Sequence, residues 1–205
     1  MSAAGREAAR TADGRDWDDL FDYHAYDPAA RVTRMGAERA RGTSPGVCPE
    51  RDALEARLDC QRESLLRTCQ GLTGDQLALR PESSSALSLL GLVRHLADAE
   101  RGSFRQLLSR PAGLQWLYRT GEAPDGAFSR ADAARAGDDL AIYAAECEAS
   151  RVAASRFGLD DILPGAQPGE PVNLRWVYLQ MIEEYARRNG QAELLRERID
   201  RAAAS

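Results

Sequence analysis

Apolar residues recur at helical spacing in four long segments of the chain, and turn-forming residues separate these segments. Each segment is long enough to bury one apolar stripe against its neighbours, as the helices of a bundle do. The pattern predicts helices over residues 50–70, 86–109, 130–157 and 172–201. We therefore expect a single all-α domain.

The connections between the predicted helices differ in length, and the longest of them bears on the topology. Residues 110–129 exceed the usual length of a bundle loop, whereas residues 71–77 make only a short turn after the first helix. Ser83–Ser85 offers an N-cap to the second helix. A bundle needs a long connection where its second and third helices are not antiparallel neighbours. We predict a four-helix bundle with a long crossover connection between helices 2 and 3.

The first 48 residues lack this periodicity and are rich in Ala, Arg, Gly and Asp. We expect residues 1–48 to be a flexible amino-terminal extension and residues 49–205 to form the bundle domain. A cluster of aromatic side chains argues for partial docking of the extension, because aromatic side chains are costly to expose. The cluster consists of Trp17, Phe21, Tyr23 and Tyr26. Alternatively, translation begins at Met35 and residues 1–34 do not belong to the protein.

Composition and charge exclude several classes of protein. The net charge of −5 and the isoelectric point of about 5.2 argue against a nucleic-acid-binding surface. No window approaches the ~20 consecutive apolar residues of a membrane helix, and the first residues lack the apolar stretch of a signal peptide. We expect a cytoplasmic protein that binds a small molecule, contacts neither nucleic acid nor membrane, and could form a homodimer.

The cysteine and lysine content adds to this picture. The four cysteines contain no CxxC pair, so we predict four free thiols, in keeping with a reducing cytoplasm. All 27 basic residues are arginine. Together with the many alanines, this bias suggests a GC-rich genome such as that of an actinobacterium.

Histidine chemistry is limited to two residues, His24 and His95. His95 lies within the second predicted helix, and the residues on its helical face are small or apolar, as the wall of a pocket requires. These residues are Ser88, Leu92, Ala99 and Gly102. The simpler alternative is a histidine whose hydrogen bonds are satisfied in the core. Asp98 and Glu100, which lie on either side of this face, are interpreted as exposed helix charges.

The last predicted helix has a line of polar residues on one face. Gln180, Glu184, Arg188 and Gln191 recur at i, i+4, i+8 and i+11 and therefore share that face. Taken alone, this line is typical of a solvated face with one ion pair between residues four apart. Glu183, one position before Glu184, is expected to point to solvent.

Two stretches, Leu89–Arg105 and Pro171–Asp200, resemble the DinB-like four-helix superfamily, and the resemblance covers roughly residues 50–200. This superfamily includes thiol-dependent transferases and the mycothiol-dependent maleylpyruvate isomerase. Its members usually hold a divalent metal with one histidine of the second helix and two ligands four residues apart on the last helix. In this sequence the matching positions are His95, Glu184 and Arg188.

The resemblance implies a degenerate metal site. Arginine stays protonated and offers no lone pair, so Arg188 cannot ligate a metal. His95 and Glu184 alone make a poor site, because catalytic zinc normally has three protein ligands. We therefore predict no resident metal, with His95 and Glu184 as vestigial ligand positions. We expect Arg188 to pair with Glu184 in the place of the cation.

The same resemblance points this helical face into a pocket and assigns roles to the residues around it. His95 and Glu184 are the candidate catalytic residues. The candidate substrate-binding residues are Arg188, Gln180, Gln191, Leu92 and Tyr185. A separate hypothesis brings His24 of the extension over the pocket mouth as a third donor beside His95 and Glu184.

Three hypotheses on function stay open. In the first, the bundle binds a small organic ligand without a metal, as a binding protein or as a metal-independent enzyme in which His95 is the acid or base. This hypothesis needs no cofactor, although mycothiol is a candidate. In the second, zinc or nickel activates mycothiol in a transferase or isomerase reaction. In the third, the pocket is vestigial and the protein is a non-catalytic interaction partner.

Overall fold

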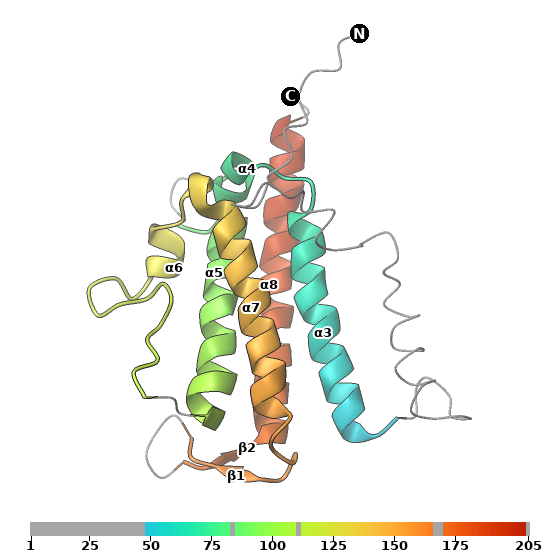
Figure 1. Ribbon diagram of the computed structural model, residues 1–205. Coiled ribbons are helices and arrows are strands. Elements are labelled where there is room, and N and C mark those ends of the chain that lie inside the picture. The colour runs from blue at the N-terminus through green and yellow to red at the C-terminus, as the bar shows by residue number, and fades with distance from the viewer. Residues whose placement is uncertain (1–47, 83–84, 110–111, 166–169, 204–205) are drawn as a thin grey trace.

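The computed structural model describes residues 48–82, 85–109, 112–165 and 170–203. Residues 1–47 of the predicted extension, with its aromatic cluster and His24, lie outside these described residues. Long helices account for most of the described chain, and Figure 1 shows them side by side. They are α3 (Glu50–Cys69), α5 (Leu89–Glu100) with its π-helical continuation η2 (Arg101–Ser109), α7 (Ala136–Ala154) and α8 (Leu174–Ala203). The expectation of an all-α fold is confirmed.

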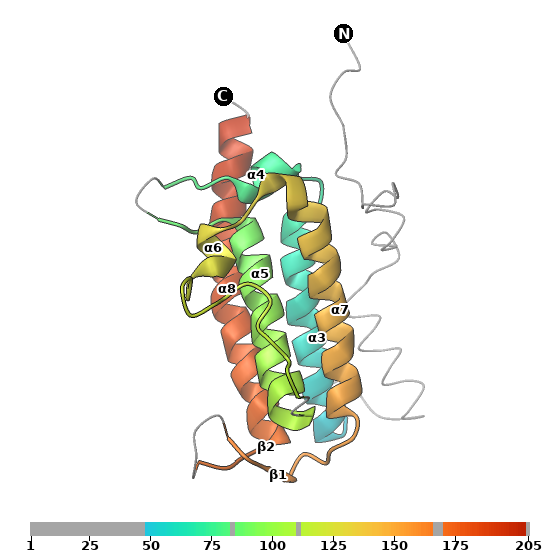
Figure 2. The same ribbon diagram turned by 60° about the vertical axis from the view of Figure 1, so that its left-hand side comes forward.

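The long helices pack pairwise around one apolar core. α3 lies against α8, and α5 contacts both α7 and α8. In Figure 1, α5 and α7 both run from the upper end of the view to the lower end, so these neighbours are parallel. The crossover segment, residues 112–135, therefore has to return along the bundle, and Figure 2 shows it passing in front of α5.

The core is formed by the apolar stripes that helical periodicity identifies. Burying one large aliphatic or aromatic side chain stabilises the folded state by roughly 1.5–3 kcal/mol. The largest fully buried side chains include Leu58, Leu65, Leu92, Leu96, Phe104, Tyr143, Met181 and Tyr185. None of the helices within the described part of the chain is long and apolar enough to cross a membrane.

Short elements lie at the ends of the bundle and in the crossover segment. The turn after α3 contains α4, which begins with a capping box because Thr73 and Gln76 exchange hydrogen bonds between side chain and backbone. The short elements are α4 (Gly74–Ala78), α6 (Gly126–Ser129), η3 (Ala133–Arg135) and the antiparallel strands β1 (Ile162–Leu163) and β2 (Val172–Asn173).

Two helix starts differ from the sequence prediction. The N-cap of α5 is Ser88 and not the Ser83–Ser85 run, because the Ser88 hydroxyl accepts a hydrogen bond from the Gly91 amide at 3.0 Å. The predicted start at residue 86 is therefore too early. α7 begins at Ala136 rather than at residue 130, because the preceding residues form the separate turns α6 and η3.

The acidic residues near His95 are buried, which corrects the expectation of exposed helix charges. Glu100 is fully buried, and Arg62 donates to its two oxygens at 2.8 and 2.7 Å. Asp98 is 5% exposed and accepts backbone hydrogen bonds from residues 117–119. The expectation is wrong for both residues because their partners belong to other elements, which periodicity along one helix cannot reveal.

Candidate functional site

One side of α5 borders a cavity of about 1190 Å³. Its walls come from α5 with η2, from the crossover segment, from Gly165 and residues 170–172 at the β1–β2 hairpin, and from the first half of α8. The side chains in these walls include His95, Trp116, Arg119, Phe128, Trp176 and Glu184. A concave site that combines apolar walls with a few polar groups is typical of small-molecule binding.

His95 of α5 and Glu184 of α8 meet at the cavity wall, with His95 Nε2 2.8 Å from Glu184 Oε1. The same carboxylate oxygen accepts a hydrogen bond from Arg188 Nε at 2.8 Å, and Arg188 Nη1 donates to Gln191 Oε1 at 3.2 Å. The predicted ion pair between Glu184 and Arg188 is thus present. Its side chains are 17% and 21% exposed, so the pair lies at the edge of the bundle rather than deep in the core.

The contacts of Glu184 determine which atom of the pair holds the hydrogen. Burial by itself would raise the pKa of Glu184, but the hydrogen bonds from His95 and Arg188 outweigh burial and hold this pKa below its usual value. The carboxylate is therefore ionised at neutral pH and can only accept hydrogen bonds. It follows that His95 Nε2 donates to Glu184, and that Nδ1 is the nitrogen of the neutral ring that can accept a proton.

Phe128 of α6 covers one face of the His95 ring. The two ring centroids are 5.4 Å apart and the planes are inclined by 29°. This approach depends on Gly91, one helical turn before His95, because a Cβ atom at residue 91 would lie 2.7 Å from Phe128 Cδ1. The glycine thus lets the crossover segment pack against α5 at the site.

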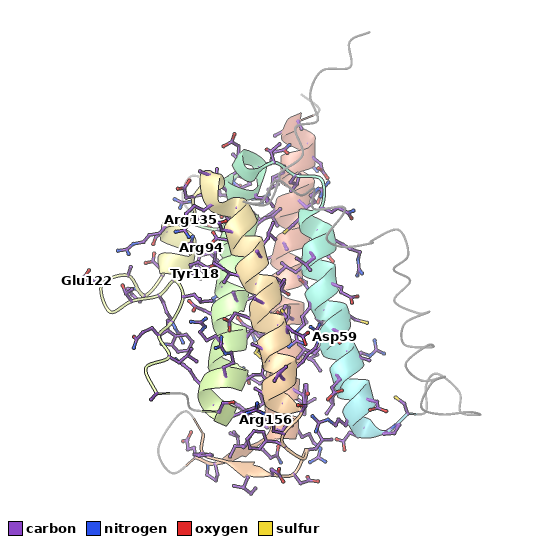
Figure 3. All side chains as sticks on the ribbon, viewed as in Figure 1. Asp59, Arg94, Tyr118, Glu122, Arg135 and Arg156 are labelled. Carbon is purple, nitrogen blue, oxygen red and sulfur yellow. The ribbon has the colours of Figure 1, made fainter. Side chains whose placement is uncertain are left out.

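Asp98 fixes the crossover segment beside the cavity. Its carboxylate accepts hydrogen bonds from the backbone N–H of Leu117 at 2.7 Å and of Tyr118 and Arg119 at 3.3 Å each. The Arg94 guanidinium lies over the Tyr118 ring, with its Cζ 4.1 Å from the ring centroid, and Figure 3 shows these two side chains together. Hydrogen bonds from several N–H donors to one carboxylate are strong, so this wall is held in place before any ligand binds.

Tyr185 belongs to a buried network behind the cavity. Its hydroxyl lies 2.8 Å from Glu100 Oε1 and 2.9 Å from the Tyr143 hydroxyl, and all three side chains are buried. These contacts join α8 to α5 and α7. Because Tyr185 directly follows Glu184, the network fixes the turn of α8 that presents the Glu184 carboxylate.

The residues assigned to the site from the sequence lie in three environments. The cavity wall contains His95, Gln180 and Glu184. The polar line along α8, beside the cavity lining, contains Arg188 and Gln191. The fully buried core contains Leu92 and Tyr185. Glu183 is exposed, as expected.

Sequence reasoning missed the crossover residues Trp116, Arg119 and Phe128 as parts of the site. Glycines on α5 and η2 are the signal that could have indicated them, since a glycine within a helix often marks a close approach by another segment. At Gly102 a Cβ atom would lie 2.6 Å from the Trp116 ring, so this glycine admits the indole to the surface of η2.

Among the described residues, the donor atoms at this site do not fit a divalent metal. Within the described ranges, no group of three or more His, Cys, Asp or Glu side chains is arranged to hold a metal ion. The position expected to supply the third ligand holds Arg188, whose guanidinium repels a cation and donates to Glu184 Oε1. That oxygen also lies 2.8 Å from His95 Nε2.

A comparison with known protein families adds to this geometry. Residues 53–201 match the model of the mycothiol-S-transferase family, from the first turn of α3 to the last turns of α8. The chain belongs to the mycothiol-S-transferase family. The DinB-like resemblance seen in the sequence is thereby confirmed, and the match includes every element that lines the cavity. No curated protein matches the chain.

Proposed function

We propose that this member of the mycothiol-S-transferase family binds a small organic ligand in the cavity beside His95 and Glu184, without a resident metal ion. The main support is the shared oxygen Glu184 Oε1, which lies 2.8 Å from both His95 Nε2 and Arg188 Nε. The guanidinium brings to this carboxylate the positive charge that a metal would otherwise supply. The cavity volume of about 1190 Å³ is sufficient for a ligand of drug-like size or larger.

In this proposal His95 is the acid–base group of the cavity. Glu184 accepts the Nε2 hydrogen and stabilises the imidazolium that forms when the ring takes up a proton, as carboxylates beside histidine do elsewhere. Phe128 stacks against one face of the His95 ring. A histidine positioned in this way typically accelerates proton transfer by roughly 10²–10⁴-fold.

The family match favours mycothiol as the ligand to test first. In a transfer without metal, His95 takes the thiol proton, the sulfur electron pair forms a bond to an electrophilic carbon, and the leaving group departs with the displaced pair. The competing candidate is a transfer in which zinc or nickel lowers the pKa of the thiol. It requires a third metal ligand besides His95 and Glu184, because Arg188 cannot be one.

Metal analysis and mycothiol titration of the purified full chain test the proposal. We expect far less than one zinc, nickel or iron ion per chain, and the same mycothiol affinity by calorimetry before and after treatment with EDTA. His95→Asn should keep this affinity and lose the transfer reaction. If EDTA abolishes mycothiol binding and zinc or nickel restores it, the metal-dependent transfer replaces the proposal. If neither mycothiol nor the aromatic probes described below bind, the vestigial pocket is the correct hypothesis.

A further inference from the structure

Arg119 is the only arginine among the described residues that line the cavity. The chain has no lysine, so within the described cavity lining this guanidinium is the only permanent cation. Its Cζ atom lies 3.2 Å from the centroid of the Trp116 ring, so the guanidinium stacks over a face of the indole. No carboxylate of the described residues lies within ion-pair distance of it, in contrast to Arg188, which Glu184 engages.

The position of Arg119 is prepared by residues that the proposed acid–base chemistry does not use. Asp98 accepts the Arg119 backbone N–H and those of the two preceding residues, which fixes the backbone. Trp116 packs against η2 at Gly102, and its ring contacts the Arg119 guanidinium. A side chain that is already ordered loses less conformational entropy when it binds, so its contacts contribute more to affinity.

Stacking on the indole occupies a face of the guanidinium and leaves its in-plane N–H groups available. These groups form a planar fork that matches the two oxygens of a carboxylate or a phosphate. The acids of the cavity wall do not compete for the fork. The Asp98 carboxylate accepts hydrogen bonds from backbone N–H groups. The Glu184 carboxylate is engaged by His95 and Arg188. The remaining two acids, Asp125 and Glu170, are exposed and lie outside ion-pair distance of Arg119.

We infer that Arg119, supported by Trp116, binds an anionic oxygen group of the cavity ligand, a carboxylate or a phosphate. The inference rests on the proposed function in that it requires a small organic ligand in this cavity. Phe128 and Trp176 provide the aromatic surface of the same cavity for the apolar part of the ligand. The ligand class is therefore a small amphipathic anion, which in a thiol transfer is the electrophilic partner, because mycothiol itself carries no carboxylate or phosphate. Its anionic group contacts Arg119 and not Arg188, which the sequence places among the candidate substrate-binding residues.

Three probes test the inference on the full chain: phenylacetate, phenyl phosphate and the neutral phenylacetamide. Their dissociation constants are measured by ligand-detected nuclear magnetic resonance. Wild-type protein should bind at least one of the anions about tenfold more tightly than phenylacetamide, which corresponds to one strong charge-assisted contact. The ratio between phenylacetate and phenyl phosphate distinguishes a carboxylate site from a phosphate site.

Variants separate recognition by Arg119 from a general effect of charge. Arg119→Gln should abolish the preference for the anion and change the affinity for phenylacetamide by less than about twofold. Arg156→Gln removes the same charge at an exposed position just beyond the lower end of α7 (Figure 3), and it should leave the preference intact. Arg119→Lys keeps the charge but loses the fork, so it should retain only part of the preference.

The possible failures are distinct. Equal binding of charged and neutral probes by wild-type protein, or an anion preference that survives in Arg119→Gln or is complete in Arg119→Lys, overturns the inference and leaves a ligand-binding cavity. If none of the probes binds and mycothiol also fails to bind, the inference and the proposed function fall together.

Discussion

Arg62 of α3 and Glu100 of α5 form a two-pronged ion pair in the core, with N–O distances of 2.8 and 2.7 Å. Glu100 is fully buried and Arg62 is 4% exposed. Burial alone would lower the pKa of Arg62, but the Glu100 carboxylate outweighs burial and raises it, so the arginine stays charged. The pair connects two helices that are far apart in the chain, and Tyr185 of α8 contacts the same carboxylate.

Removing one member of this pair should strongly destabilise the protein. We expect Arg62→Met to lower the free energy of unfolding by about 3–5 kcal/mol, because it leaves a buried carboxylate without its cation. Urea denaturation followed by circular dichroism measures the change. Arg57→Met on the same helix is the control, since Arg57 is exposed, and it should cost less than about 0.5 kcal/mol. Equal costs for the two variants would show that the pair is not buried in solution.

The ion pair at the site should matter much less for stability. Arg188→Ala is expected to lower the free energy of unfolding by less than about 1 kcal/mol, because Arg188 and Glu184 are both partly exposed and their attraction is screened by water. Arg187→Ala is the control on the same helix. It removes an exposed ion pair with Glu183 and a longer contact, 3.8 Å, with Glu184 Oε2, and it leaves the hydrogen bond from Arg188 to Glu184 Oε1 in place. A cost of several kcal/mol for Arg188→Ala alone would contradict the position of this pair at the bundle edge.

The lowered pKa of Glu184 predicts a dependence of stability on pH. Its ordinary value is 4.5, and the folded protein holds it lower, so the ionised carboxylate stabilises the folded state. This contribution is fully present above pH 4.5 and is lost as the pH falls through the lower pKa of the folded state. The difference in unfolding free energy between wild type and Glu184→Gln should therefore be larger at pH 6 than at pH 3. A difference that grows on acidification would refute this reading of the pair.

The four cysteines should differ in their reactivity toward a thiol reagent such as Ellman's reagent. Burial raises the pKa of Cys69 and of Cys147 to about 12, so neither should react at pH 8 in the folded protein. Cys48 is exposed, whereas Cys60 is half-buried with a raised pKa and should react more slowly. Cys48→Ser is expected to remove the fast phase, and urea should release the buried thiols. Rapid reaction of all four thiols in the folded protein would exclude this packing.

The helices follow from the sequence because they depend on spacing along the chain. Periodicity places the bounds of the long helices within six residues of those observed. It is least precise at helix starts, where a local cap such as Ser88 determines the first residue of the helix. The ion pair between Glu184 and Arg188 follows from a separation of four residues on one helix. His95 and Glu184 are found as site residues through the DinB-like resemblance, because spacing alone also fits a solvated face and a core histidine.

The other cavity wall could be found only in the tertiary structure. Trp116, Arg119 and Phe128 lie in a connection without regular periodicity, where no repeating pattern indicates which side chains line the cavity. Asp98 looks like a surface charge in its own helix, yet it is buried because the crossover segment returns over α5 and donates three backbone N–H groups to it. Such contacts depend on how distant segments pack, and the environment of a charged group is set by those packed neighbours rather than by its place on a helix.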